Sequence, residues 1–392
     1  MRTTLALLLF ATAAPAADPP ANVADALKAI TSVSKEGTGN EAAAAGWKVV
    51  TSAGGEALIP TLTAFDGASP TAANWLRSAV DAIVEKETKA GKKLPGIWAF
   101  VKDTKRSPEA RRIAFELARA EDKAAADKLL PEMTDDPNLE IRKEAIAAKL
   151  PIVFGTGESV PARKAAIRQL FEQVRDKEQA ESIAKVLTEL GQKPDLTRHF
   201  GYVTEWQIVG PFDSPKGVGF AQAYPPEKGV DLAAKSPGKG GEITWKPTQS
   251  ADTYGKVDLN AELGKHMDCV AYAHAVIVSD KEMPVEIRAA SPNSIHIYLN
   301  GKKLFQREEY HHGSVMDQHT GKGTLKAGKN EVLIKLVQNN QTEKWAQSWD
   351  FSARVCDWSG GALPVKQEVV RDGKTQVVDL GAIRETPKKE GK

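Results

Sequence analysis

The apolar positions of the chain follow a helical period in its first half and a strand period in its second half. Between residues 21 and 197, apolar side chains recur three or four positions apart, which places them on one side of a helix. One such stripe consists of Ala110, Ile113, Ala114, Leu117 and Ala118. After residue 200, short apolar or alternating runs such as 332–337 lie between Gly, Pro and Asn residues, which is typical of strands and turns. The pattern predicts an all-α domain, residues 21–197, followed by an all-β domain, residues 200–360.

The predicted helical domain contains a weak internal repeat. The pattern R-[RK]-x-A-[FI] occurs at residues 111–115, 142–146 and 163–167. The segment DDPNLEIRKEAIAAKL resembles the second helix of a HEAT-type repeat. Because the motifs are irregularly spaced, we expect a degenerate HEAT-like array in which each helix pair packs on the next. Such an array is either a surface for protein partners or a structural platform for the next domain, and both interpretations remain open.

The predicted β domain is defined by short strands and clear turns. Strands are expected at 243–246, 256–259, 269–278, 285–289, 295–299, 303–305, 332–337 and 348–355. Asn300-Gly301 predicts a type I′ hairpin turn, because both central residues of that turn need a positive φ. Many short strands between turn residues predict a sandwich or jelly roll.

The order of motifs in this half resembles the galactose-binding-like jelly roll. Within residues 200–358 the motifs are WQIVGPF, AYAHAVIV, VEIRAASPNSIHIYLNG, LKAGKNEVLIKLVQ and WDFSARV. The whole chain is similar to exported bacterial proteins that join HEAT-like repeats to such a domain. The resemblance implies an all-β jelly-roll sandwich like that of sugar-binding modules, with glycans bound by loops at one end. It provides no binding motif that can be carried over residue by residue.

The first 17 residues, MRTTLALLLFATAAPAA, have the features of a secretory signal peptide. A basic start, a short apolar run and the small-residue pattern Ala-Pro-Ala follow one another in the required order. Export to the periplasm or the extracellular space is therefore predicted. After this segment no run approaches the roughly 20 apolar residues that span a bilayer, so we expect no transmembrane segment in the mature chain.

Composition and cysteine usage narrow the class of protein further. Of the 392 residues, 41% are hydrophobic and 27% are charged, and the formal net charge is +2. This balance lacks the basic excess of a nucleic-acid-binding domain, so nucleic acid is not an expected partner. Cys269 and Cys356 lie in predicted strands, and in an oxidising compartment we expect them to form a disulfide. Two buried free thiols are the alternative.

The loop at residues 307–319 is rich in histidine and acid and is the main candidate binding site. Its tyrosine can stack on a sugar ring, and its carboxylates can accept hydrogen bonds from sugar hydroxyls. A tryptophan beside the amide side chains of residues 339–341 is the best candidate for an exposed aromatic. The predicted ligand-binding residues are Glu309, Tyr310, His311, Asp317, His319 and Trp345. A solvated loop whose polar groups pair with one another is the alternative interpretation.

The imidazole and carboxylate groups of this loop also permit a divalent metal site. The weak candidates for its ligands are His311, His312, Asp317 and His319. Their spacing matches neither H-E-x-x-H nor C-x-x-C. No cofactor is therefore predicted beyond this possibility.

The sequence as a whole favours an exported, non-catalytic binding or scaffold protein. In this hypothesis the β domain binds a glycan or a cell-envelope protein, and the helical repeats form an interaction platform. The alternative is a metal-dependent or glycan-hydrolysing enzyme centred on residues 307–319. The sequence contains no nucleophile elbow, P-loop or dinucleotide fingerprint, and no catalytic residue is assigned. Residues 361–392 are expected to form an extended or disordered tail.

Overall fold

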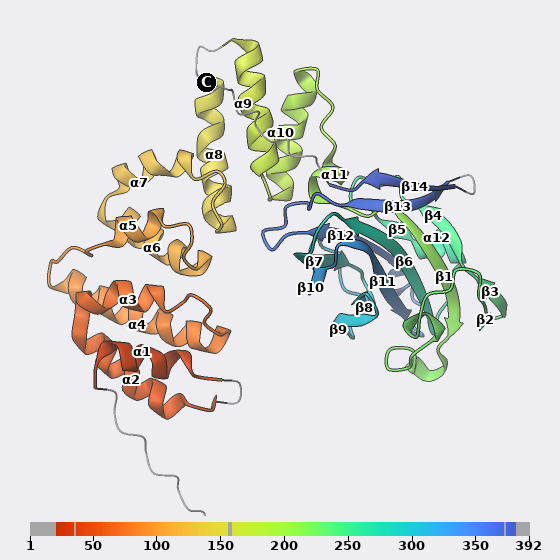
Figure 1. The fold of residues 1–392 in the computed structure, drawn as a ribbon, viewed down its shortest axis with the longest axis horizontal. Coiled ribbons are helices and arrows are strands. Elements are labelled where there is room, and N and C mark those ends of the chain that lie inside the picture. Colours follow the sequence, from red (N-terminus) through yellow and green to blue (C-terminus); the bar gives the residue numbers. More distant parts are fainter. Residues whose placement is uncertain (1–20, 35–36, 156–158, 372–373, 382–392) are drawn as a thin grey trace, which may run out of the picture. The chain divides into compact units, whose positions relative to one another are not determined.

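The computed structural model describes residues 21–34, 37–155, 159–371 and 374–381, and the chain divides into two compact units (Figure 1). One unit is Met1–Gly157 and the other is Glu158–Lys392. The predicted signal peptide, residues 1–17, lies outside the described residues. Within the described ranges, no helix combines the length and the apolar character needed to cross a bilayer.

The first unit is built from helices, as the apolar stripes predicted. They are α1 (Val23–Thr31), α2 (Asn40–Ala53), α3 (Leu58–Thr63), α4 (Pro70–Lys89), α5 (Ile97–Lys102), α6 (Pro108–Glu121), α7 (Lys123–Leu129) and α8 (Leu139–Gly155). The hydroxyls of Ser69 and Ser107 cap α4 and α6, and a proline follows each of them in the first helical turn. Proline is tolerated there because the N–H it lacks has no partner within the helix.

The arginine of the repeated motif has a structural role in this unit. Arg111 in α6 is buried and makes two hydrogen bonds of 2.6 Å with the buried carboxylate of Asp136. Its Nε and Nη2 also donate to the carbonyl of Val101, at 3.1 and 2.7 Å. Arg142, at the same position of the next motif, donates from Nε to the carbonyl of Asp136 at 2.7 Å. The motif therefore fixes the turn that precedes α8 against α6 and the end of α5.

The second unit begins with helices that precede its first strand. These are α9 (Val160–Gln173), α10 (Lys177–Glu189) and α11 (Leu196–Phe200). In α10, the ammonium of Lys177 lies 4.3 Å from the centre of the Tyr254 ring in the β part, and the hydroxyl of Tyr254 donates to Glu181. The boundary that the sequence predicts near residue 200 is therefore a change from helix to strand within the second unit. The compact units divide earlier, at Gly157, because these helices pack on the β part.

Two antiparallel sheets form the β part of this unit. The large sheet has eight strands, β1 (Glu205–Asp213), β4 (Lys246–Gln249), β6 (Cys269–Ser279), β8 (Ser294–Leu299), β9 (Lys302–Arg307), β11 (Gly328–Gln338), β13 (Lys366–Arg371) and β14 (Lys374–Asp379). Their order is β14-β13-β6-β11-β8-β9, with β1 pairing both β4 and β6. The small sheet has four strands in the order β10 (His319–Leu325), β7 (Met283–Ala290), β12 (Asp350–Cys356) and β5 (Val257–Asp258). A separate hairpin joins β2 (Lys235–Gly238) to β3 (Gly241–Thr244), and α12 (Leu259–Leu263) follows β5.

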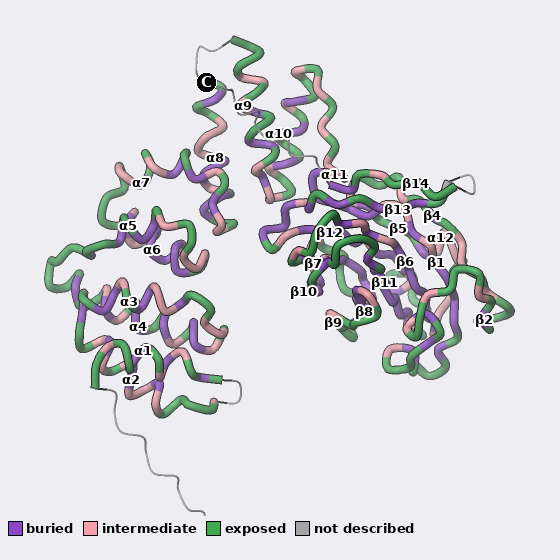
Figure 2. The backbone as a smooth tube through the Cα atoms, in the orientation of Figure 1, coloured by how far each residue is buried: buried purple, intermediate pink, exposed green. Residues whose placement is uncertain are grey.

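The two sheets enclose one apolar core. Alternate residues of β11 enter it, namely Val332, Ile334 and Leu336. Trp206 of β1 packs edge-on against Phe351 of β12, with the ring centres 5.3 Å apart. Figure 2 shows the central strands as almost continuously buried. At the turn between β8 and β9, Asn300 and Gly301 have φ values of 51° and 77°, which confirms the predicted positive-φ hairpin.

The predicted disulfide is not formed, and the two cysteines are the buried free thiols of the alternative interpretation. Cys269 is on β6 of the large sheet and Cys356 is on β12 of the small sheet, and both are buried free thiols. Each Sγ instead lies 3.6 Å from a backbone carbonyl, that of His266 or of Glu286. Burial raises the pKa of Cys269 to about 12 and that of Cys356 to about 11.

The described part of the predicted extended or disordered tail is extended and forms a β-hairpin. Residues 366–371 and 374–379 form β13 and β14, and β13 pairs with β6 in the large sheet. The side chain of Gln367 donates to the carbonyl of Glu205 in β1. Backbone pairing and this amide contact therefore fix the segment to the large sheet.

Candidate functional site

Two loops bring aromatic and amide side chains together at one end of the large sheet. The first loop follows β9 and carries Tyr310 and His311, and the second follows β11 and carries Asn339, Gln341 and Trp345. His311 Nε2 lies 2.9 Å from Asn339 Oδ1, and Asn339 Nδ2 donates to Gln341 Oε1 at 3.1 Å. The rings of His311 and Trp345 meet edge-on, with their centres 5.4 Å apart. We call these residues the Trp345 platform.

Backbone contacts hold the two loops in place. The amide of His311, which has a φ of 61°, donates to the side chain of Asn293 at 3.3 Å. On the other loop, the carbonyl of Asn339 accepts from the amide of Asp268 at 2.8 Å. Ala346 is fully buried beside Trp345, and its carbonyl accepts from the Gln338 amide at 3.4 Å. These contacts anchor the neighbours of Trp345, while Trp345 itself is 66% exposed.

The chemistry of the platform suits recognition of a ligand. An exposed indole offers a flat apolar face for stacking, and the imidazole and amide groups donate and accept hydrogen bonds. The arrangement can therefore offer both stacking and hydrogen bonds to a ligand.

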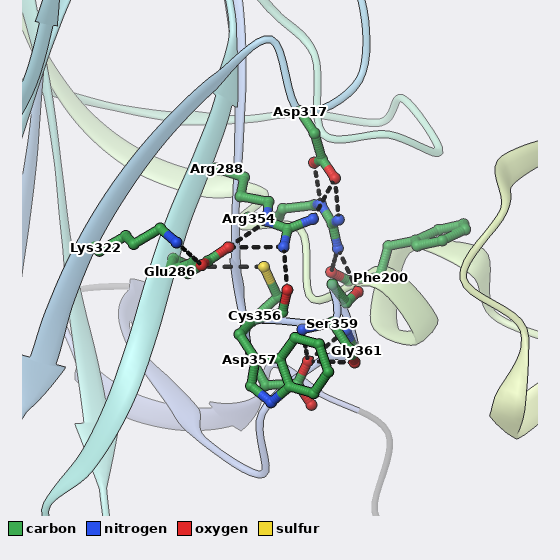
Figure 3. Close-up of polar contacts among 12 residues, drawn as sticks. Phe200, Glu286, Arg288, Asp317, Lys322, Arg354, Cys356, Asp357, Ser359 and Gly361 are labelled. Atoms are coloured by element: carbon green, nitrogen blue, oxygen red, sulfur yellow. Dashed lines mark hydrogen bonds and ion pairs between the residues drawn. The ribbon is translucent and has the colours of Figure 1, made fainter. Parts of the chain in front are cut away.

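Asp317, predicted to bind ligand, faces two arginines instead (Figure 3). Arg354 donates to its carboxylate from Nε at 2.6 Å and from Nη2 at 2.5 Å, and Arg288 donates from Nη1 at 2.8 Å. Burial alone would raise the pKa of Asp317, but the two guanidinium groups outweigh burial and hold it below its usual value. Its oxygens therefore already carry charge-assisted hydrogen bonds from within the chain.

The same arginines join the small sheet to the segments around it. Arg354 Nη1 donates to the carbonyl of Phe200, at the end of α11, and to that of Gly360. Arg288 also pairs with Glu286 at 2.7 Å and donates to the carbonyl of Trp358 at 2.7 Å. Figure 3 shows these groups converging at the end of α11. We call Asp317, Arg288 and Arg354 the Asp317 cluster. Its hydrogen bonds link the small sheet to the end of α11 and to the loop after β12.

The remaining predicted residues of the loop also face other partners. Glu309 pairs with Arg307, whose hydrogen bond lowers the pKa of Glu309. His319 is buried at the start of β10, where its ring centre is 5.4 Å from that of Phe305 and burial lowers its pKa. Of the predicted ligand-binding set, Tyr310, His311 and Trp345 come together, and Glu309, Asp317 and His319 do not join them.

The metal hypothesis finds no ligand set in the described part of the chain. There, no three His, Cys, Asp or Glu side chains are placed to hold one ion. Among the weak candidates, His311 is bonded to Asn339, Asp317 faces the arginines, His319 lies against Phe305, and His312 is exposed. The enzyme alternative that relied on such an ion therefore has no observation to support it.

Sequence reasoning missed a second polar cluster, on the side of the large sheet that faces away from the core. Glu227 accepts from the hydroxyls of Tyr272 at 2.5 Å and Tyr298 at 2.6 Å, and from Lys335 Nζ at 2.9 Å. His296 Nδ1 lies 3.0 Å from the Tyr298 hydroxyl. We call this group the Glu227 cluster. The lysine that interrupts the apolar run VLIKLV was the available signal in the sequence.

Burial and hydrogen bonding set the charges of the Glu227 cluster. Burial alone would raise the pKa of Glu227, but its three hydrogen bonds outweigh burial and lower it. Burial lowers the pKa of Lys335 despite its contact with Glu227, and it raises the pKa of Tyr272 and Tyr298. Burial also lowers the pKa of His296 to about 3. At neutral pH the cluster therefore contains a carboxylate, neutral phenols and a neutral imidazole.

Comparison with known proteins gives no family for this chain. No family model matches it, and no curated protein matches it. A solved anti-sigma factor domain-containing protein is 8% identical at a TM-score of 0.24, with 45% of this chain and 46% of that chain covered. A β-glucosidase from Kluyveromyces marxianus in complex with glucose is 17% identical at a TM-score of 0.25, with 40% and 16% covered.

A β-glucuronidase from an uncultured Clostridium sp. is 12% identical at a TM-score of 0.23, with 45% and 33% covered. The chain thus spans less than half the length of each of these structures. At such TM-scores the matches carry no argument about fold or function.

Proposed function

We propose that the protein is an exported, non-catalytic binding protein that recognises a glycan, free or on a cell-envelope partner, through the Trp345 platform. The observation that carries the proposal is the exposed indole of Trp345 held edge-on to His311, beside the bonded amides of Asn339 and Gln341. In this proposal the two-layered β part is a galactose-binding-like jelly roll. The helices within residues 21–197 form a HEAT-like array that acts as an interaction platform.

The groups of the Trp345 platform are those that a sugar surface requires. A sugar ring has an apolar face of C–H groups and a rim of hydroxyls, so it binds where an aromatic surface and hydrogen-bonding groups lie side by side. Trp345 and Tyr310 supply aromatic surface, and Asn339 and Gln341 supply donors and acceptors. The indole is exposed although its neighbour Ala346 is buried, so the fold anchors the loop and leaves the ring available.

The export part of the proposal has its own support. Residues 1–17 have the order of charge, apolar run and small residues that a signal peptidase substrate requires. Fractionation of cells expressing the full chain should place the mature protein outside the cytoplasm. Recovery of the uncleaved chain in the cytoplasm would contradict it.

A glycan array with the full-length protein and its Trp345→Ala variant tests the binding site. We expect a glycan ligand whose affinity falls about thirtyfold in the variant, the loss typical of an aromatic residue that dominates an interface. The matched control is Trp358→Ala, because Trp358 is 55% exposed and lies beside the Asp317 cluster. The proposal fails if the array yields no ligand, or if Trp345→Ala binds as well as Trp358→Ala.

A further inference from the structure

Residues 214–234, between β1 and β2, cover the side of the large sheet that faces away from the core. We call them the cover segment and that side the outer face. Lys335 Nζ of β11 donates to the carbonyl of Phe220 at 3.3 Å and to that of Gln222 at 2.6 Å. The ring of Phe220 meets that of His296 at 4.5 Å, and the ring of Tyr224 meets that of Phe212 at 5.1 Å. The segment is therefore held on the outer face by polar and aromatic contacts.

Three adjacent strands converge on one carboxylate of this segment. Tyr272 of β6 lies directly opposite Lys335 of β11, and Lys335 lies directly opposite His296 of β8. Tyr298 is two positions further along β8, so its side chain emerges on the same face. Because backbone pairing fixes these positions, the sheet presents its donors in a rigid arrangement. Glu227 then accepts one hydrogen bond from each of Tyr272, Tyr298 and Lys335.

Packing alone does not explain these groups. Lys335 is 0% exposed, and a buried ion pair is often no more stabilising than apolar side chains of the same shape. A leucine or methionine could cover the sheet as well. His296 is 3% exposed, and its Nε2 has no hydrogen-bond partner among the described residues. The outer face therefore has a hydrogen-bonding atom, His296 Nε2, that the cover segment does not contact.

The cover segment itself is weakly anchored by apolar burial. Most of its residues are exposed, and Tyr224 and Pro226 are among the few that are buried. Segments with few buried apolar contacts open locally at a lower free-energy cost than the core strands do. The hydrogen bonds of Glu227 and Lys335 therefore contribute much of the free energy that keeps the cover segment on the outer face.

We propose that the outer face is a binding site for a carboxylate-bearing ligand, and that Glu227 of the cover segment occupies it as an internal ligand. Opening of the segment withdraws Glu227 and leaves Tyr272, Tyr298 and Lys335 free to receive an external carboxylate. The ligand's apparent affinity is then lowered by the fraction of molecules that are closed. This site is separate from the Trp345 platform and does not depend on the glycan proposal.

Chemical rescue of the full-length Glu227→Ala variant tests the carboxylate site directly. Formate or acetate is added at constant ionic strength, with chloride as the reference anion, and thermal unfolding is followed. We expect a saturable rise in Tm with either carboxylate, because the anion replaces the missing side chain and binds only the folded state. In the wild-type protein the rise should need a higher carboxylate concentration, since Glu227 fills the site in closed molecules. Glu227→Ala/Lys335→Met should show no rise, since the cation is gone.

The same comparison remains decisive if Glu227→Ala does not fold in chloride. In that case refolding yield replaces Tm, and formate should restore it while chloride should not. Equal effects of carboxylate and chloride on Glu227→Ala, in unfolding or in refolding, would overturn the proposal.

Limited trypsin digestion of Glu227→Gln tests the role of the cover segment. Lys216 and Lys228 are exposed cleavage sites within it. We expect cleavage there to be about tenfold faster than in the wild type, because proteolysis of a locally opened segment follows the population of the open form. The matched control is Glu242→Gln, which removes an exposed ion pair with Lys235 on the adjacent hairpin. If Glu227→Gln and the wild type are cut at the same rate, Glu227 does not hold the segment closed and the proposal fails.

Discussion

The central strands of the large sheet are buried on both faces, but the two faces differ in chemistry. On β11, Ile334 faces the core between the sheets, whereas its neighbours Leu333 and Lys335 face the cover segment. The core face is apolar and is covered by a second sheet. The outer face combines aromatic rings with the Glu227 cluster and is covered by irregular chain. Burial alone thus does not distinguish a packed core from a polar face closed by a movable segment.

The difference follows from the period of two along a strand. Successive side chains point to opposite faces, so one strand such as 332–337 serves two environments. Substitutions on the core face should lower the stability of the whole β part. Substitutions on the outer face should act first on the cover segment.

The largest effect on stability is expected on the core face. Ile334→Ala should lower the free energy of unfolding by about 2–5 kcal/mol, because it leaves a cavity between two rigid sheets. Leu333→Ala, one position away on the outer face, should cost less, because the irregular segment above it can collapse into the space. Urea denaturation of both full-length variants provides the measurement. An equal loss for the two would mean that the outer face is as tightly packed as the core.

A smaller and more local effect is expected from Lys335→Met. The substitution leaves Glu227 with its two tyrosine contacts but without its cation, at a cost of about 1–3 kcal/mol to the closed segment. Hydrogen exchange should therefore accelerate within residues 214–234 and change little in β11. The double variant Lys335→Met/Glu227→Gln should recover part of the protection, because no unpaired charge remains buried. Unchanged exchange in the segment would contradict this assignment.

The buried histidines of the second unit predict a pH dependence. Burial lowers the pKa of His199 and His274 to about 4 and that of His296 to about 3, from 6.5. The unfolded chain therefore binds more protons than the folded chain below pH 6.5. Their contribution to stability is full above that pH and is lost as the pH falls towards 4.

The expected loss is about 1.4 kcal/mol per pH unit for each of these histidines. Urea midpoints measured between pH 7 and 4 test it, and His274→Gln should make the slope shallower. His312→Gln, at an exposed position, is the matched control. A slope that His274→Gln leaves unchanged would show that this imidazole does not resist protonation in the fold.

The smallest effect on stability is expected at the Trp345 platform. Trp345→Ala should change the free energy of unfolding by less than about 0.5 kcal/mol, because the indole is largely exposed. Trp349→Ala, four positions along and fully buried, should cost about 3–5 kcal/mol. The same denaturation experiment compares them. A comparable loss for both would assign Trp345 to structure and remove it from the binding hypothesis.

Local signals predicted much of the fold and part of the candidate site. The alternation in 332–337 and the Asn300-Gly301 turn specify their strands and hairpin without distant contacts. Tyr310, His311 and Trp345 were recognised by residue type, and the structure brings them together. These features could be predicted because the chemistry of each is visible within a few residues of sequence.

Other features depend on close approach in three dimensions. The segment HTGKGTL contains a single apolar residue, Leu325, and is not among the predicted strands, yet it forms β10. A Cβ at Gly321 would come within 2.9 Å of the Leu304 side chain, so glycine there permits close approach to β9 and is not a sign of a turn. Asp317 meets Arg288 and Arg354 only through the fold, since they lie 29 and 37 positions away in the sequence.

The hairpin of β13 and β14 has a consequence for association between molecules. One edge of β6 is paired by β1 over residues 269–274 and by β13 over 276–278. Without β13, the β-branched run around Val276, Ile277 and Val278 would present unpaired backbone groups along an open edge. Such an edge is a template for another chain, and β-branched sequences of low charge are those that stack into fibrils. By pairing with β6, β13 therefore prevents this apolar stretch from pairing with another copy of the chain. The strand left at the edge is β14, which has the charged residues Lys374 and Asp379 at its ends.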